Sequence, residues 1–154
     1  MVPRIDNPFA KAAAAIKGMY AVEGAIAASL DKTVLQLVKL RASQMNGCAY
    51  CLHMHAIEAR ANGESEMRIY LLDAWRESSL YSARERAALA WTEALTNVSR
   101  TGAPDDDYAL VEAAFDEVER VHLTLAIGSI NLWNRLQVGL RAIHPTGKSH
   151  APTA

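Results

Sequence analysis

The chain has 154 residues, of which 51% are hydrophobic and 21% charged, and its formal net charge is −1. This length and composition predict one globular domain over residues 1–154 and exclude a disordered chain. Because the sequence contains no basic block, no secretory signal and no stretch of about 20 apolar residues, we expect a cytoplasmic protein that binds neither nucleic acid nor membranes.

The sequence predicts an all-α fold, because helix-favouring residues dominate and the alternation typical of strands is hard to find. Asn7 followed by Pro8 is a typical helix start, and this first helix can extend to about residue 29, with Gly18 and Gly24 as weak points. Asp31 is then placed to cap a second helix. That helix is expected to end at the turn-forming pair at residues 46–47.

Further start and stop signals predict the helices of the middle of the chain. Ser82 and Glu85 have the spacing of a capping box, and the acidic residues 105–107 precede another apolar stretch. Residues 101–104 form a clear break before it. The helices predicted from these signals cover residues 48–63, 66–74, 82–95 and 105–115.

The last predicted helix covers residues 118–143 and is apolar on more than one face between Val118 and Val138. Such a helix is buried all round. Because a chain of 154 residues cannot easily surround it, we expect a homo-oligomer; a central helix buried inside a monomer is the alternative. The predicted core covers about residues 31–144, and residues 145–154 are expected to form a frayed tail.

The two cysteines, Cys48 and Cys51, stand three positions apart. A secreted scaffold spreads several cysteines along the chain, whereas a close pair in a cysteine-poor chain is typical of redox or metal chemistry. On a helix with about 100° per residue, Cys48, Cys51, His55 and Glu58 share one face, and Tyr50 points away from it. The spacing therefore predicts two thiols, an imidazole and a carboxylate along one line.

These residue types suit the reduction of a peroxide. A thiolate attacks the O–O bond, and both a helix N-terminus at Cys48 and the imidazole of His55 favour the ionised form of a nearby thiol. The attack leaves a sulfenic acid, which the second thiol converts to a disulfide and water. A partner dithiol then reduces the disulfide by exchange, so the cycle needs no organic cofactor and no metal.

Two other interpretations of the cysteine pair remain open, and a third is excluded. The two cysteines can be ordinary buried hydrophobic residues. They can bind zinc, provided that two histidines complete a set of four ligands. Covalent haem attachment requires a histidine directly after the second cysteine, where this chain has Leu52.

Residues 37–55, with the sequence LVKLRASQMNGCAYCLHMH, resemble the core of the alkylhydroperoxidase AhpD-like proteins within the carboxymuconolactone decarboxylase superfamily. The resemblance runs from about residue 31 to residue 144. The Cys-x-x-Cys-x-x-x-His pattern after Ser-Gln-x-Asn-Gly is its most specific part. Further matching segments are residues 58–60, 85–91 and 131–135.

The resemblance implies an all-helical fold, homo-oligomers that are often trimers or hexamers, and peroxidase activity through the cysteine pair. It implies that Cys51 attacks the peroxide, that Cys48 resolves the sulfenic acid, and that His55 belongs to a proton relay. The position of Cys48 at a helix N-terminus, taken alone, favours Cys48 as the more acidic thiol.

Two positions depart from the pattern of the family. Characterised members have a glutamate of the relay twelve residues before the first cysteine, where this chain has Gln36, which cannot accept a proton. Members closest to the characterised peroxidases often have a histidine before the second cysteine, where this chain has Tyr50. We hypothesise that Glu58 partly replaces the missing carboxylate, because it lies on the same helix face as His55.

The sequence therefore predicts an enzyme, a thiol-dependent peroxidase that takes a hydroperoxide as substrate and a dithiol or thioredoxin-like protein as reductant. The alternative is a thiol-disulfide exchange or redox-sensing protein with little peroxidase activity, which Gln36 favours. A lactone-carboxylate lyase, as in the decarboxylase branch, has no use for the cysteine pair. A non-catalytic oligomeric module is the remaining possibility.

Overall fold

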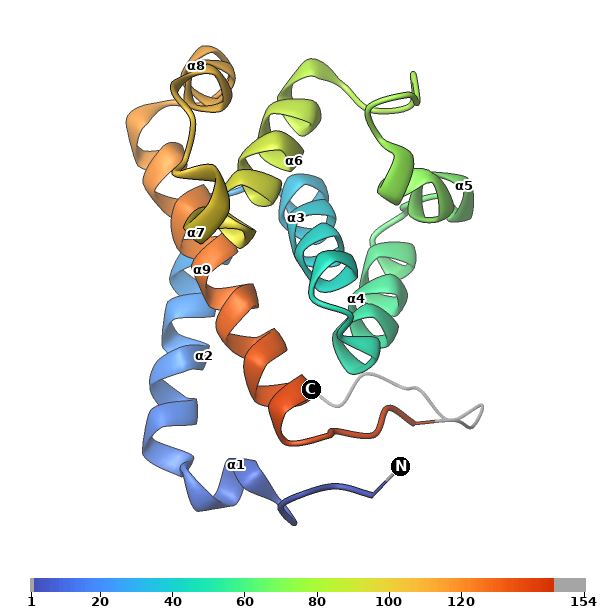
Figure 1. Ribbon diagram of the computed structural model, residues 1–154, viewed down its shortest axis with the longest axis vertical. Coiled ribbons are helices and arrows are strands. Elements are labelled where there is room, and N and C mark those ends of the chain that lie inside the picture. Colours follow the sequence, from blue (N-terminus) through green and yellow to red (C-terminus); the bar gives the residue numbers. More distant parts are fainter. Residues whose placement is uncertain (1, 146–154) are drawn as a thin grey trace.

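Figure 1 shows the computed structural model of the chain, which describes residues 2–145. Within these residues the fold is all-α, as predicted, with a short 3₁₀ segment at Leu71–Ala74 and no strand. The α-helices are α1 (Pro8–Lys11), α2 (Ala13–Ala27), α3 (Lys32–Met45), α4 (Ala49–Ala61), α5 (Glu66–Tyr70), α6 (Ala83–Thr96), α7 (Val98–Thr101), α8 (Asp105–Ala114) and α9 (Glu117–Gly139). The predicted tail lies almost entirely outside the described residues.

The first predicted helix is in fact two helices. Asn7 caps α1 as expected, because its side chain accepts a hydrogen bond from the backbone N–H of Ala10. The break falls at Ala12, where φ is −129°, and not at Gly18 or Gly24, which both lie within α2. The break lets α1 turn away from the line of α2 (Figure 1) and lay Phe9 against Trp133 of α9, with ring centroids 5.8 Å apart.

Most predicted helix starts are confirmed. Asp31 caps α3 by accepting from the backbone N–H of Val34, and Ser82 forms a complete capping box with Glu85 at the start of α6. From residue 98 onward the predicted helix bounds were less accurate. Residues 98–101 are helical, Pro104 occupies the N-cap of α8 while the acidic residues lie in its first turn, and α9 ends at Gly139.

Helix α3 is the centre of the fold and packs against α4, α6 and α9 (Figure 1). Its residues are buried on more than one face, which is why it separates two hydrophobic clusters. Val34 and Val38 belong to the cluster shared with α2, α6 and α9, whereas Leu37 and Leu40 belong to the cluster shared with α4, α6 and the segment around Trp75. The C-terminal end of α3 is thereby held next to the start of α4.

Helix α9 is not buried all round in the single chain, which contradicts the alternative of a central helix buried inside a monomer; the homo-oligomer stays a prediction. Its inner face is buried through residues such as Leu123 and Ile127. Its outer face carries an apolar stripe of residues that are each about half exposed or more and repeat at intervals of three, four and seven residues: Val118, Val121, Leu125 and Leu132.

Among the helices of residues 2–145, none combines the length and the apolar character that a membrane span requires.

Candidate functional site

Cys48 and Cys51 form a disulfide at the N-terminal end of α4, with Cα atoms 5.4 Å apart. Cys48 is the N-cap residue of α4, and its Sγ accepts a hydrogen bond from the backbone N–H of Cys51 at 3.3 Å. Gly47 makes the turn from α3 possible, since its φ of +64° is one that residues with a side chain rarely adopt. Both sulfurs are buried, although they sit at the beginning of a helix.

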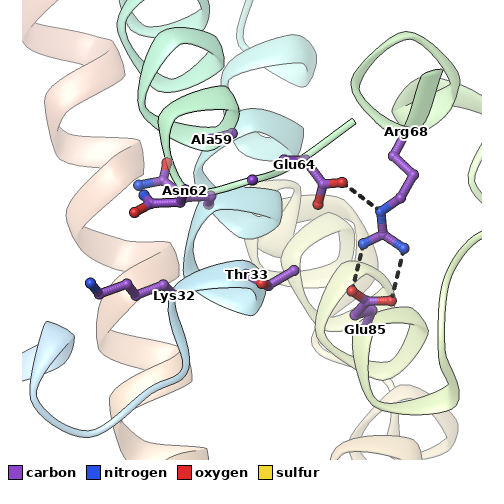
Figure 2. A pocket seen from close by; sticks show the side chains of 9 residues that line it. Lys32, Thr33, Ala59, Asn62, Glu64, Arg68 and Glu85 are labelled. Carbon is purple, nitrogen blue, oxygen red and sulfur yellow. Dashed lines mark hydrogen bonds and ion pairs between the residues drawn. The ribbon is translucent and has the colours of Figure 1, made fainter. Parts of the chain in front are cut away.

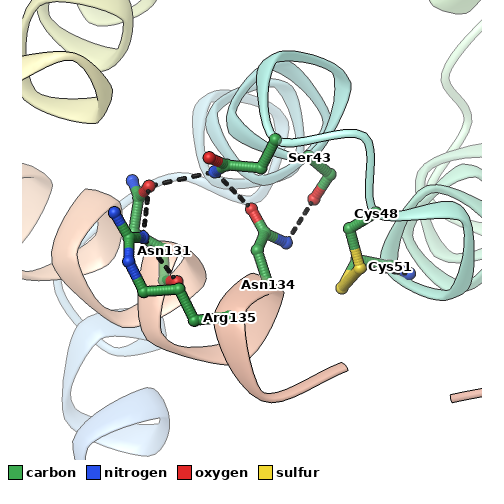
Figure 3. The surroundings of a disulfide bond; sticks show 7 residues. Ser43, Cys48, Cys51, Asn131, Asn134 and Arg135 are labelled. Carbon is green, nitrogen blue, oxygen red and sulfur yellow. Dashed lines mark hydrogen bonds between the residues drawn. A yellow bond between two sulfur atoms is a disulfide. The ribbon is translucent and has the colours of Figure 1, made fainter. Parts of the chain in front are cut away.

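A network of amide side chains holds the turn before Cys48 against α9 (Figure 3). Asn46 donates to the side-chain oxygens of Asn131, at 3.0 Å, and Asn134, at 2.9 Å. Asn134 in turn donates to Ser43 Oγ at 3.0 Å. Buried polar groups that are fully bonded to one another fix a single local arrangement, so this network sets the position of the disulfide between α3, α4 and α9.

His55, Glu58 and Gln36 form a chain of hydrogen bonds beside the disulfide. His55 is buried and its Nδ1 lies 2.9 Å from Glu58 Oε2, which also accepts a hydrogen bond from Gln36 Nε2 at 3.3 Å. The bond from His55 is the main reason that the pKa of Glu58 lies below its usual value. An ionised carboxylate can only accept, so Nδ1 carries the hydrogen and Nε2 of a neutral ring has the free lone pair.

Gln36 therefore touches the predicted site, but as a donor to Glu58. Its Oε1 is buried and has no hydrogen-bond partner among the described residues. The reverse orientation of the amide would direct this oxygen at the carboxylate of Glu58, and two acceptors repel each other. The structure thus places Glu58, and not residue 36, in direct contact with the imidazole of His55.

Cys51 opens into a cavity of about 230 Å³ together with His55 and Glu58. Cys48 is not among the residues that line it. Tyr50 is, and it also borders a further cavity, so the N-terminal turn of α4 lies between the two. The remaining lining residues are Phe9, Tyr20, Glu23, Lys39, Met54, Ile130, Trp133 and Gln137.

The far wall of this cavity holds an ion pair that the sequence did not reveal. Lys39 Nζ lies 2.5 Å from Glu23 Oε2, and Ser129 donates to the other oxygen of Glu23 at 2.5 Å. Burial raises the pKa of Glu23, but the hydrogen bonds from Lys39 and Ser129 outweigh it, so this pKa is lowered. Among the lining residues other than His55, the two glutamates and one lysine give a net charge of −1.

A second cavity, of about 250 Å³, is lined by Gln36 together with Arg68, Glu64 and Glu85, the last three of which are labelled in Figure 2. Arg68 crosses it and pairs with Glu64 at 2.7 Å and with Glu85 at 2.5 Å. Neither a cysteine nor a histidine lines this cavity. The ion pairs in this second cavity join α5 to α6, which explains why charged side chains gather there. Cys51 and His55 line the first cavity instead.

The zinc alternative requires further ligands close to the cysteines. Within residues 2–145 no three side chains of His, Cys, Asp and Glu are grouped so that they can hold a metal ion. Cys48 and Cys51 are bonded to each other. The geometry of the described part of the chain therefore provides a disulfide beside an imidazole and no zinc ligand set of the usual kind.

Comparison with known sequences identifies relatives. Residues 10–94 match the carboxymuconolactone decarboxylase family. The uncharacterized protein YdfG of Bacillus subtilis is 45% identical over 112 residues, which are 73% of this chain and 76% of YdfG. The uncharacterized protein YnjA of Escherichia coli is 35% identical over 104 residues, which are 67% of this chain and 56% of YnjA.

Solved structures agree with this grouping. A protein of unknown function from Agrobacterium tumefaciens, suggested to be the antioxidant defence protein AhpD, has a TM-score of 0.90 and 44% identity, with 95% of this chain and all of that chain covered. The debrominase Bmp8 shares the fold at a TM-score of 0.80 and 16% identity, over 89% of this chain and 74% of its own. The chain is therefore an AhpD-like member of the carboxymuconolactone decarboxylase family.

Proposed function

We propose that the protein is a thiol-dependent peroxidase that reduces organic hydroperoxides and cycles through the Cys48–Cys51 disulfide. One observation carries this proposal: Cys51 is bonded to Cys48 and opens into the same cavity as a buried imidazole that is oriented by a carboxylate. A thiol, a base and a group that holds the base are the parts that an activated nucleophile needs.

In the reduced protein, His55 Nε2 accepts the proton of the Cys51 thiol. The thiolate attacks the terminal oxygen of the hydroperoxide, the O–O bond breaks, and the proton passes from His55 to the departing alkoxide, which leaves as an alcohol. Cys51 then carries a sulfenic acid. The Cys48 thiol attacks the sulfur of this group, and water leaves as the disulfide forms.

Glu58 and Gln36 act on this reaction through His55. Glu58 holds Nδ1 and so leaves Nε2 to take the thiol proton, and Gln36 holds Glu58 through its amide. In this arrangement Glu58 takes the place of the family glutamate that Gln36 replaces. The aromatic side chains of Phe9, Tyr20 and Trp133 favour an organic hydroperoxide over hydrogen peroxide, because they contribute apolar contact area and few polar groups.

A thiol-disulfide exchange protein with little peroxidase activity is the second candidate. Gln36 favours it, since the position that carries a carboxylate in characterised peroxidases cannot accept a proton here. The position of Cys48 as the N-cap of α4 also favours it, because the backbone N–H of Cys51 stabilises a thiolate there.

We also propose a homo-oligomer, with a trimer or hexamer as in the family, in which the stripe of Val118, Val121, Leu125 and Leu132 lies at the subunit interface. An exposed apolar row of this length on one helix is typical of surfaces that are covered in the assembled protein.

The proposal is tested by titrating the prereduced protein with cumene hydroperoxide. We expect one molecule of alcohol and one disulfide per molecule of peroxide, at a rate at least about 100-fold above that of the same chain unfolded in denaturant. Glutathione disulfide serves as the comparison oxidant. If it forms the Cys48–Cys51 disulfide while the hydroperoxide reacts no faster than with the unfolded chain, the exchange function replaces the peroxidase.

A further inference from the structure

The two cysteines of the disulfide line different cavities. Cys51 lines the cavity described above, whereas Cys48 lines another of about 270 Å³. This Cys48 cavity is walled by the start of α4 and by the last turn of α9 with the segment after it; its lining residues are Gly47, Cys48, Ala49, Tyr50, Gln137, Val138, Arg141 and Ala142. The two sulfurs can thus be reached from different sides.

The two cavities differ in charge. The Cys51 cavity contains the carboxylates of Glu23 and Glu58 against one lysine, so it repels an anion. Among the residues that line the Cys48 cavity, Arg141 is the only charged one. A hydroperoxide is neutral, whereas the thiol that attacks a disulfide does so as an anion. The charges therefore favour the anionic thiolate in the Cys48 cavity over the Cys51 cavity, whereas they do not hinder the neutral hydroperoxide in the Cys51 cavity.

Arg141 is held at this place by the backbone. It has a φ of +56°, a conformation that residues other than glycine rarely adopt, and Ala142 behind it donates its N–H to the carbonyl of Gln137 at 2.9 Å. From the N-terminal segment, Arg4 donates to the carbonyls of Gly139 and Leu140. The segment after α9 is thus fixed across the end of α4 that carries the disulfide (Figure 1). Strained backbone of this kind persists where surrounding contacts enforce it.

We propose that the reductant enters through the Cys48 cavity, that its thiolate is attracted by Arg141, and that it attacks Cys48. This inference rests on the proposed function and adds to it the route of the second reactant. The peroxide and the reductant then use opposite sides of one disulfide and do not compete for one cavity.

Reduction of the disulfide through Cys48 takes two exchange steps. One thiol of a dithiol loses its proton to the solvent and bonds as a thiolate to Cys48 Sγ, the Cys48–Cys51 bond breaks, and Cys51 leaves as a thiolate that takes up a proton from the solvent by way of His55 Nε2. The second thiol of the reductant then attacks the mixed disulfide and releases Cys48 as a thiolate, which takes up the remaining proton. The dithiol ends as a disulfide, and the protein ends with two thiols. His55 favours the departure of Cys51, whereas the backbone N–H of Cys51 favours the departure of Cys48, so the different cavities and charges beside the two cysteines, and not the stability of the departing thiolate, carry the inference.

The attacked sulfur is identified by trapping the mixed disulfide. The oxidised protein is mixed with glutathione, quenched in acid within milliseconds, alkylated and mapped by tandem mass spectrometry. We expect glutathione on Cys48 and the alkyl group on Cys51 in at least about nine of ten modified chains, because the two sulfurs open on different sides. Glutathione mainly on Cys51, or shared equally, would overturn the inference.

The role of Arg141 is tested with two dithiols of different charge. Arg141→Glu is expected to slow reduction by dithiothreitol, which attacks as a thiolate with one negative charge, about threefold, and reduction by meso-2,3-dimercaptosuccinate, whose two carboxylates add further negative charge, about tenfold or more. Arg100→Glu, which makes the same charge change on α7 away from both cavities, is the control. Unchanged rates for both dithiols in Arg141→Glu, or equal effects of the two variants, contradict the proposal.

These measurements separate the inference from the proposed function. They begin with the disulfide and use no peroxide, so they can succeed in a protein that reduces hydroperoxides poorly. Conversely, rapid oxidation by hydroperoxide with glutathione found on Cys51 would retain the peroxidase and reject the separate entrance for the reductant.

Discussion

Replacing Cys51 with serine is expected to slow the reaction of the reduced protein with cumene hydroperoxide by more than about 10³-fold. A serine hydroxyl is not ionised near neutral pH, and it does not form a stable sulfenic-acid equivalent, so the first step of the cycle is lost. Stopped-flow mixing under single-turnover conditions measures the rate.

Cys48→Ser is the matched control, because it removes the other sulfur of the same disulfide. This variant is expected to reduce its first molecule of hydroperoxide at a rate within about threefold of the wild type, and then to stop, since no thiol is left to resolve the sulfenic acid. The assignment of roles is wrong if Cys48→Ser is the slow variant, and the cycle itself is wrong if neither substitution matters.

His55→Ala is expected to slow the same step about 10² to 10⁴-fold at pH 7, the usual contribution of a general base. The defect should shrink as the pH approaches the ordinary thiol pKa of about 8.5, because the thiol then ionises without help. A pH series of the stopped-flow rate checks both points. A defect that stays constant up to pH 9 would mean that His55 acts only by packing.

Glu58→Gln is expected to slow the reaction with hydroperoxide about tenfold, which is less than His55→Ala does. The reason is that the imidazole of His55 loses the carboxylate that orients its Nδ1. The hydrogen bond from His55 lowers the pKa of Glu58. The stabilisation that ionised Glu58 gives to the folded protein is therefore fully present above the ordinary glutamate pKa range. It is lost only as the pH falls through the lowered pKa of Glu58. Glu66→Gln, on an exposed carboxylate of α5, is the control. If Glu58→Gln leaves the rate and the thiol pKa of Cys51 unchanged, Glu58 does not support the relay.

The local part of the site followed from the sequence. Helix periodicity placed Cys51, His55 and Glu58 on one face of one helix, and the hydrogen bond between His55 and Glu58 agrees with it. Capping side chains likewise located the starts of α3 and α6 correctly. These features depend on residues three or four positions apart, and at that range the backbone geometry alone decides which side chains meet.

The walls of the two cavities could not be predicted. Glu23, Lys39 and Trp133 come from α2, α3 and α9, and Arg141 comes from the segment after α9. Which of these residues line a cavity therefore depends on how the helices pack. The break at Ala12, which directs Phe9 to Trp133, has no marker in the sequence, since alanine favours the helix. Tertiary contacts overrule local propensity there.

The most direct test traps the sulfenic acid on the sulfur that reacts first. Cys48→Ser and Cys51→Ser are each prereduced, mixed with one equivalent of cumene hydroperoxide in the presence of dimedone, and weighed by mass spectrometry. We predict close to one dimedone per chain in Cys48→Ser and less than about a tenth of that in Cys51→Ser. Equal labelling of the two variants, or labelling confined to Cys51→Ser, would contradict a cycle that begins at the cysteine beside His55.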